Sequence, residues 1–233
     1  MGHRARLVAL ASVLSVGCGG PSSPTSAVPG PLGLTAQQFD ERLEALVLGT
    51  GPLSPSDSGC SSGQLSGLNA TLPAFTLTFS SRTTDDQRDA VMRVFSGYKD
   101  AAGMTFALDA RVVDEVAVAQ LGEFTFEIFT TPGSACSNPN AVGCASGGGF
   151  SKSRGQVFLG NPSAALAGHE AGHLIGLCHI EATTGTTGQT AMLGAGGLGP
   201  LDIEVLKKVY GAGLRPGATK EQFVRAGVLP RPQ

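Results

Sequence analysis

The stretch HEAGHLIGLCH, from His169 to His179, holds three of the four histidines in a chain of 233 residues. It follows Asn161-Pro162-Ser163, a sequence typical of a helix start, and residues 164–177 are mostly good helix formers. On a helix, residues four apart lie on the same face, so His169 and His173 are neighbours. The pattern therefore predicts a helix that directs two imidazoles toward one point.

A third imidazole and a carboxylate complete the pattern. Gly176 can leave the helix in a left-handed conformation, which brings His179 back toward the two helical histidines. Three neutral nitrogens with an open fourth position are typical of a catalytic zinc site, whereas a structural site is closed. Glu170 lies on a neighbouring face, too poorly directed to bind the ion but close enough to hold a water. We expect Zn2+ to be bound by His169, His173 and His179, with Glu170 as the catalytic residue.

The stretch resembles the motif HExxHxxGxxH of the metzincin metallopeptidases at every fixed position. Metzincins also carry a methionine turn under the zinc, and Met192, within QTAML, is the one methionine downstream of the motif. PLDIEVLKKVYG, residues 200–211, is similar to the last helix of the matrixin group. The resemblance implies a metzincin-like catalytic domain: a twisted, mostly parallel sheet with an antiparallel edge strand, an active-site helix and a C-terminal helix.

The sequence departs from the familiar metzincin subfamilies at two positions. Gly194 stands where astacins and serralysins carry a tyrosine that reaches the zinc, so no fifth protein ligand is expected. Ile180 follows the last histidine, where the familiar subfamilies have Ser, Asp, Glu or Pro. The resemblance is closest to a matrixin-like bacterial lipoprotein, these two positions leave the subfamily and its cleavage preference open, and the predicted ligand set is unchanged.

The resemblance also implies that a substrate lies extended along an edge strand above the cleft. Glycines leave backbone groups open to pair with a peptide, and the sequence GGGFS begins at residue 147. The residues expected in this strand are Gly147, Gly148, Gly149 and Phe150. A plain flexible loop is the alternative interpretation of the same stretch.

The rest of the chain predicts an α+β fold. Residues 35–48 and 84–102 each open with a Thr-x-x-Gln capping box and carry apolar residues at helical spacing. Strands are expected over residues 75–79, 105–113, 124–130 and 156–159. The order is one helix, a strand, a second helix, several strands and then helices, which is typical of the α+β class.

The N-terminal region predicts export and a lipid anchor. In residues 1–17, two arginines precede an apolar run that is too short to span a bilayer, as in a signal peptide. The run ends in SVGC, which resembles a bacterial lipobox with Cys18 as the lipidated residue, although ordinary signal cleavage is the alternative. Residues 18–34 are rich in Gly, Ser and Pro, as in a disordered tether. We then expect an N-terminal helix and loop over residues 35–72 and the metzincin-like catalytic domain over residues 73–233.

Four further cysteines indicate two disulfides, because the chain is expected outside the cytoplasm. Cys136 and Cys144 flank the turn-rich sequence SNPNAVG, so a local bridge between them is feasible. Elimination then pairs Cys60 with Cys178. The alternative is a free Cys60 that reaches the metal and keeps the enzyme latent.

These features together indicate an exported zinc endopeptidase. Its substrates would be extracytoplasmic proteins or peptides, cleaved through a zinc-bound water with Glu170 as general base. A formal charge of −2 gives no reason to expect nucleic acid, and the chain is expected to be a monomer that meets a membrane only through its lipid, or to be secreted. The alternatives are a zinc hydrolase of a non-peptide amide and a non-catalytic, surface-binding lipoprotein with a relic site.

The mature N-terminus tests the predicted anchor. We expect the exported protein to begin at a lipid-modified Cys18, because the apolar run ends at Gly17-Cys18 and a tether follows. Mass spectrometry of the N-terminal peptide measures this directly. An unmodified Cys18, or a mature chain that starts elsewhere, would remove the membrane from the interpretation.

Overall fold

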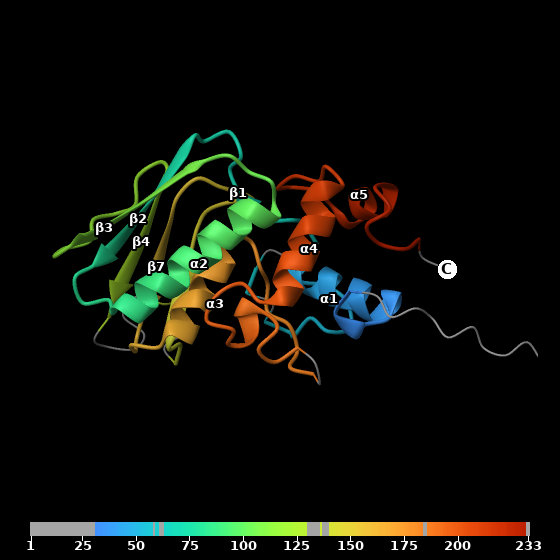
Figure 1. Ribbon diagram of the computed structural model, residues 1–233, viewed down its shortest axis with the longest axis horizontal. Coiled ribbons are helices and arrows are strands. Elements are labelled where there is room, and N and C mark those ends of the chain that lie inside the picture. Colours follow the sequence, from blue (N-terminus) through green and yellow to red (C-terminus); the bar gives the residue numbers. More distant parts are fainter. Residues whose placement is uncertain are drawn as a thin grey trace, which may run out of the picture.

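The computed structural model describes residues 31–57, 59–60, 63–129, 136, 140–183 and 186–231. The predicted signal peptide, Cys18 and the tether up to residue 30 lie outside these described residues. Within the described ranges the chain has a mixed α+β fold, as the order of elements predicts (Figure 1). No helix in these ranges combines the length and the apolar character needed to cross a bilayer.

The main sheet has five strands in the order β3-β2-β4-β7-β5. Its first four strands are parallel, and β5 pairs antiparallel with β7 at one edge, which confirms a mostly parallel sheet with an antiparallel edge strand. The strand bounds are β2 (Ala74–Ser80), β3 (Ala107–Val113), β4 (Glu123–Ile128), β5 (Gly143–Ser146) and β7 (Gly155–Leu159). A second, two-stranded parallel sheet joins β1 (Gly67–Leu68) to β6 (Ser151–Lys152).

The two helices with capping boxes are confirmed. Thr35 and Thr84 each accept a hydrogen bond from the backbone of the glutamine three residues later, and each glutamine side chain bonds back to the cap. The helices are α1 (Ala36–Leu48), α2 (Asp85–Ala101), α3 (Ala164–Leu174), α4 (Pro200–Gly211) and α5 (Lys220–Arg225), with 3-10 turns η1 (Pro31–Gly33) and η2 (Ala191–Leu193). Helices α2 and α3 pack together beside the sheet, and α1, α4 and α5 gather beyond its end (Figure 1).

The core forms between the sheet and α2. Alternate residues of a strand point to one face, so Phe75, Leu77 and Phe79 of β2 are all buried on the same side. On the neighbouring strand β4, Phe124 packs against Phe95 of α2 with ring centroids 5.3 Å apart. Each buried phenylalanine contributes about 2–3 kcal/mol through the hydrophobic effect. This packing fixes α2 on the sheet and gives α3 a surface to lie against.

The N-terminal helix shares this core. Leu43 and Leu46 of α1 are fully buried in the same apolar cluster as the sheet and the C-terminal helices. Two main-chain hydrogen bonds tie this region to the segment after α3: Cys178 N–H donates to Leu46 O at 2.7 Å, and Glu181 N–H donates to Leu53 O at 2.8 Å. Residues 35–72, which the sequence separates from the catalytic segment, therefore pack within the same folded unit.

Two disulfides cross-link segments of the described chain. Cys136 pairs with Cys144 across a short loop, with their Cα atoms 5.8 Å apart. Cys60 pairs with Cys178, with Cα atoms 5.4 Å apart and a sequence separation of 118 residues. Because Cys60 is in a disulfide, it does not offer the thiol that the alternative of a cysteine latency switch requires.

Asp202 connects α4 to the turn η2. This buried carboxylate accepts hydrogen bonds from Thr190 Oγ1 at 2.5 Å, Ala191 N at 2.7 Å and Gly199 N at 3.0 Å. Burial raises the pKa of the Asp202 carboxyl to about 6, although the three donors act in the opposite direction. The aspartate thus satisfies buried donors at the start of η2 and at the start of its own helix.

Replacing Asp202 should destabilise the protein. Asp202→Ala leaves buried donors without an acceptor, so we expect a loss of about 3 kcal/mol and a melting temperature lower by roughly 6–12 °C. Glu204→Ala on the same helix is the matched control, because Glu204 bonds only to Lys207 at the surface and should change stability by less than ~1 kcal/mol. Equal melting temperatures for the two variants would show that Asp202 does not hold η2 in place.

Candidate functional site

Helix α3 carries the first two histidines. Ser163 caps its start by accepting a hydrogen bond from Leu166 N at 3.2 Å. Ala167 and Ala171 are fully buried on the core side of the helix, which leaves His169 and His173 on a different side, lining a cleft. The small alanines let α3 pack closely while the imidazoles remain available to the cleft.

The helix ends just before the third histidine. Gly176 has a φ of +98°, in the left-handed region, as the sequence predicts. Gly176 N–H donates to His173 O at 3.2 Å and Leu177 N–H donates to Gly172 O at 2.9 Å, the bond pattern of a Schellman cap. The helix thus ends at Leu174, three residues earlier than the helix-forming run suggested, and the turn directs the chain back toward His179.

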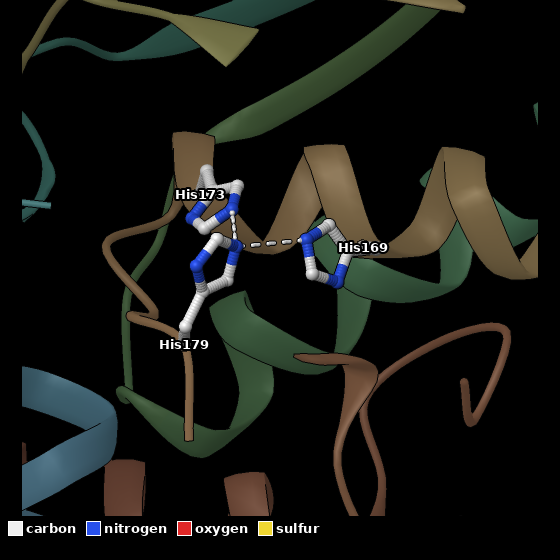
Figure 2. Close-up of side chains that lie close together, drawn as sticks. All are labelled: His169, His173 and His179. Carbon is white, nitrogen blue, oxygen red and sulfur yellow. Dashed lines mark hydrogen bonds between the residues drawn. The ribbon is translucent and has the colours of Figure 1, made fainter. Parts of the chain in front are cut away.

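The three imidazoles meet at their Nε2 atoms. His179 Nε2 lies 3.2 Å from His169 Nε2 and 3.0 Å from His173 Nε2. Figure 2 shows His179 reaching from the loop after the helix toward both helical histidines. The structure therefore brings together all three residues that the sequence selected as metal ligands.

The opposite ring nitrogens fix the tautomers. His169 Nδ1 lies 3.2 Å from Met192 O, and His173 Nδ1 lies 2.9 Å from Leu177 O. His179 Nδ1 lies 2.8 Å from Asp57 O. A carbonyl oxygen can only accept, so each Nδ1 must carry the proton and donate it. Each Nε2 then presents a lone pair to the common centre.

Three converging lone pairs fit a zinc ion. Lone pairs repel one another at 3.0–3.2 Å, and a cation between them removes this repulsion. With zinc–nitrogen bonds of about 2.0–2.1 Å, nitrogens at tetrahedral corners are about 3.3–3.4 Å apart, close to the distances observed. Carbonyl partners on the opposite ring nitrogens are the usual outer support of metal-binding histidines. The donor set thus matches zinc in chemistry and in spacing.

The surroundings keep two of the imidazoles neutral. Burial, and to a smaller extent the neighbouring imidazole of His179, lower the pKa of His169 to about 4. Burial likewise lowers the pKa of His173 well below its ordinary value. Neutral imidazole is the form that binds a metal, so at neutral pH these two rings are ready as ligands.

Lys152 supports the helix end that carries His173. Its Nζ donates to His173 O at 2.5 Å, near the C-terminus of α3, where a positive charge is favourable. The side chain is buried, and burial lowers the pKa of Lys152 to about 8. Nothing in the sequence pattern marked this lysine, because its partner is a main-chain carbonyl far along the chain.

Glu170 lies in the same cleft beside the imidazoles. Only 5% of its surface is exposed, and burial raises the pKa of its carboxyl to about 7. Its Oε1 approaches Gly143 of β5 so closely that a Cβ at that position would lie 2.7 Å from it. Glu170 does not belong to the group of three imidazoles that could hold a metal ion, which agrees with a role in moving protons.

Met192 lies against the ligand helix. It is buried in η2, and its sulfur would meet a Cβ at Gly172 at 2.8 Å, so the glycine is what allows the close contact. The main-chain oxygen of Met192 is also the partner of His169 Nδ1. The predicted methionine turn therefore touches the site through its side chain and its backbone.

The cleft has a volume of about 640 Å³ and runs between α3 and β5. One wall is formed by Leu166, Glu170 and the three histidines, and the other by residues 140–145 with Cys136. Asp57, Gly59, Ala165 and Gly194 complete the lining. A carboxylate, three imidazole nitrogens and a strand edge thus face one common space.

The edge strand lies earlier in the chain than the sequence predicted. The expected residues Gly147, Gly148, Gly149 and Phe150 connect β5 to β6 and do not line the cleft. Gly149 has a φ of +71°, which interrupts an extended chain, and Phe150 O accepts a hydrogen bond from Gly67 N of the smaller sheet. The sheet edge beside the cleft is β5 (Gly143–Ser146).

Two residues of β5 direct their main-chain groups away from the sheet. Gly160 N–H donates to Val142 O at 2.8 Å, and antiparallel pairs alternate between bonded and non-bonded, so Cys144 bonds to β7 in the same way. Gly143 and Ala145 fall between these pairs. Their N–H and C=O groups therefore point outward, where an extended peptide could pair with them.

Zinc should stabilise the protein specifically. We expect a protein stripped with a chelator to bind about one zinc, and its melting temperature to rise by roughly 5–10 °C when free zinc is about 100-fold above Kd. Calorimetry or dye-monitored melting measures this, with Mg2+ as the control, because Mg2+ prefers oxygen ligands. Equal melting curves with and without zinc, together with no bound metal, would contradict the assignment of the three imidazoles as ligands.

No protein-family model matches the sequence, and no curated protein matches it.

Proposed function

We propose that the protein is a zinc-dependent endopeptidase with a metzincin-like catalytic domain. The observation that carries this proposal is the convergence of three unprotonated Nε2 atoms beside a buried glutamate, in a cleft bounded by a sheet edge. The motif HEAGHLIGLCH, the methionine turn at Met192 and the mostly parallel sheet with an antiparallel edge support the family assignment.

Glu170 is the proposed general base and acid. Zinc held by the three imidazoles would supply Lewis-acid chemistry, which activates water and polarises a carbonyl group. The Glu170 carboxylate, buried next to that position, accepts a proton from the attacking water and delivers it to the leaving amine nitrogen. Because Glu170 is held between α3 and β5, its carboxylate stays close to a substrate bound at the strand edge.

The sheet edge is the proposed substrate-binding element. An extended peptide adds a strand to an exposed edge through main-chain hydrogen bonds. Gly143 and Ala145 offer such groups, and Gly143 lies so close to Glu170 that a Cβ there would be 2.7 Å from Oε1. A peptide paired with Gly143 would thus place a backbone amide near the glutamate and the imidazoles.

We also propose that the protein works outside the cytoplasm, held by a lipid on Cys18 or secreted. Disulfides form and persist in oxidising compartments, and the structure pairs four cysteines in two disulfides. The signal-like N-terminus and the Gly/Ser/Pro-rich stretch support the same location. Its substrates would then be proteins or peptides of that compartment.

Two variants should distinguish the role of Glu170 in catalysis from the role of the histidines in zinc binding. Glu170→Ala keeps all three nitrogens, so we expect about one bound zinc and a loss of roughly 10²–10⁴ in cleavage rate. His169→Ala removes a ligand, so zinc affinity and cleavage should fall together. Metal analysis and cleavage assays on the same preparations measure both, with exposed Glu181→Ala as the control.

The cleavage assay uses a mixed peptide library, with and without a zinc chelator, and locates cut sites by mass spectrometry. Chelator-sensitive cuts that Glu170→Ala abolishes support the proposal. Loss of zinc from Glu170→Ala would make Glu170 a ligand, and full activity without Glu170 would assign the base to another residue. Zinc binding without any peptide cleavage would favour a hydrolase of another amide or a non-catalytic protein.

A further inference from the structure

A segment before the sheet lies against the imidazoles. Asp57 and Gly59 line the cleft together with His173 and His179, although more than 110 residues separate them in sequence. The segment adjoins the chain after α3 at two further places, through Glu181 N–H to Leu53 O at 2.8 Å and through the Cys60–Cys178 disulfide. These contacts bracket His179 on both sides.

The first contact orients His179. This histidine lies beyond the end of α3, so the helix does not set the direction of its ring. Its Nδ1 donates to Asp57 O at 2.8 Å, which fixes the tautomer and directs Nε2 toward the other two imidazoles. The group that orients the third ligand is thus a main-chain carbonyl of the N-terminal region.

The second contact is steric. Gly59 has a φ of +66°, and a Cβ at this position would lie 2.6 Å from Cε1 of His173 and 3.0 Å from Cε1 of His179. Gly59 N–H also donates to Asp57 Oδ1 at 3.2 Å, so the two residues that meet the imidazoles are bonded to each other. The absence of a side chain at Gly59 is therefore what lets the segment touch both rings.

The third contact is covalent. Cys178 is fully buried and directly precedes His179, and Cys60 directly follows Gly59. The disulfide between them joins the segment to the ligand loop at the point of contact. The bond therefore limits how far Asp57 and Gly59 can move from the imidazoles.

We infer that Asp57, Gly59 and the Cys60–Cys178 disulfide form a positioning element of the metal site, so that the affinity for zinc depends on this segment. The inference rests on the proposed zinc site. It assigns the segment a role in orienting His179 beyond its contribution to folding.

Two glycine variants test the steric contact. Gly59→Ala places a methyl group against both rings, whereas Gly63→Ala has nothing within 4 Å of its Cβ. Both glycines have positive φ values, +66° and +86°, so both substitutions strain the backbone. We expect Gly59→Ala to bind zinc roughly tenfold to hundredfold more weakly than wild type, the range typical for a lost outer support, with Gly63→Ala close to wild type.

Competition with a chromophoric chelator gives the zinc affinity, and the visible spectrum of the Co2+-loaded proteins reports ligand geometry. The melting temperature of each metal-free protein records the structural cost separately. A lower affinity and an altered Co2+ spectrum in Gly59→Ala alone, at similar metal-free stability of the two variants, support the inference. Equal affinities and spectra for the two variants overturn it.

Variants of the two disulfides give a second test of whether zinc affinity depends on this segment, and this test remains available if Gly59→Ala does not fold. The double variant Cys60→Ser/Cys178→Ser should weaken zinc binding at least tenfold, whereas Cys136→Ser/Cys144→Ser leaves the three Nδ1 bonds in place and should bind as wild type does. Equal zinc affinity of both double variants and wild type overturns the inference. A wild-type protein that binds no zinc overturns the proposed function itself, and the inference with it.

Discussion

Three hydrogen bonds from imidazole Nδ1 atoms to main-chain carbonyls control the geometry of the candidate site. Their acceptors come from three separate regions: Asp57 before the sheet, Leu177 at the end of α3 and Met192 in η2. Each bond fixes one ring and exposes one lone pair, so a change in any region alters the common centre. The site therefore depends on the packing of the whole chain, including α1, α4 and Asp202, and not only on the ligand helix.

Glycines allow these regions to approach one another. Because Gly172, Gly143 and Gly59 lack a side chain, each leaves room for a close neighbour. These neighbours are the sulfur of Met192, the carboxylate of Glu170 and two imidazole rings, respectively. A side chain at any of these positions would push apart the elements that meet at the cleft. Part of the high glycine content of the chain is thus explained by close packing around the site. Another part is explained by turns in which glycine adopts a positive φ.

Periodic side-chain patterns made part of this structure predictable. Helical spacing placed His169 and His173 on one face, Gly176 marked the helix exit, and capping boxes located α1 and α2. The sequence analysis did not predict strand β5, because its four small residues show no alternation of apolar and polar side chains. The strand was predicted instead at GGGF, in the loop that follows β5. Asp57 contacts His179 through its own main-chain carbonyl, and Lys152 binds the main-chain carbonyl of His173. Any residue type supplies such a carbonyl, so neither contact leaves a pattern in the sequence.

The long span of the Cys60–Cys178 bond also bears on the order in which the molecule is completed. The acceptor for His179 is synthesised more than 110 residues before its donor, whereas η2 and α4, which support His169, follow both. No N-terminal fragment that ends before Met192 contains all three main-chain acceptors, and disulfides form and persist in oxidising compartments. If the protein is an exported hydrolase, as proposed, its metal centre would be completed after export, and the cytoplasm would not be exposed to its activity.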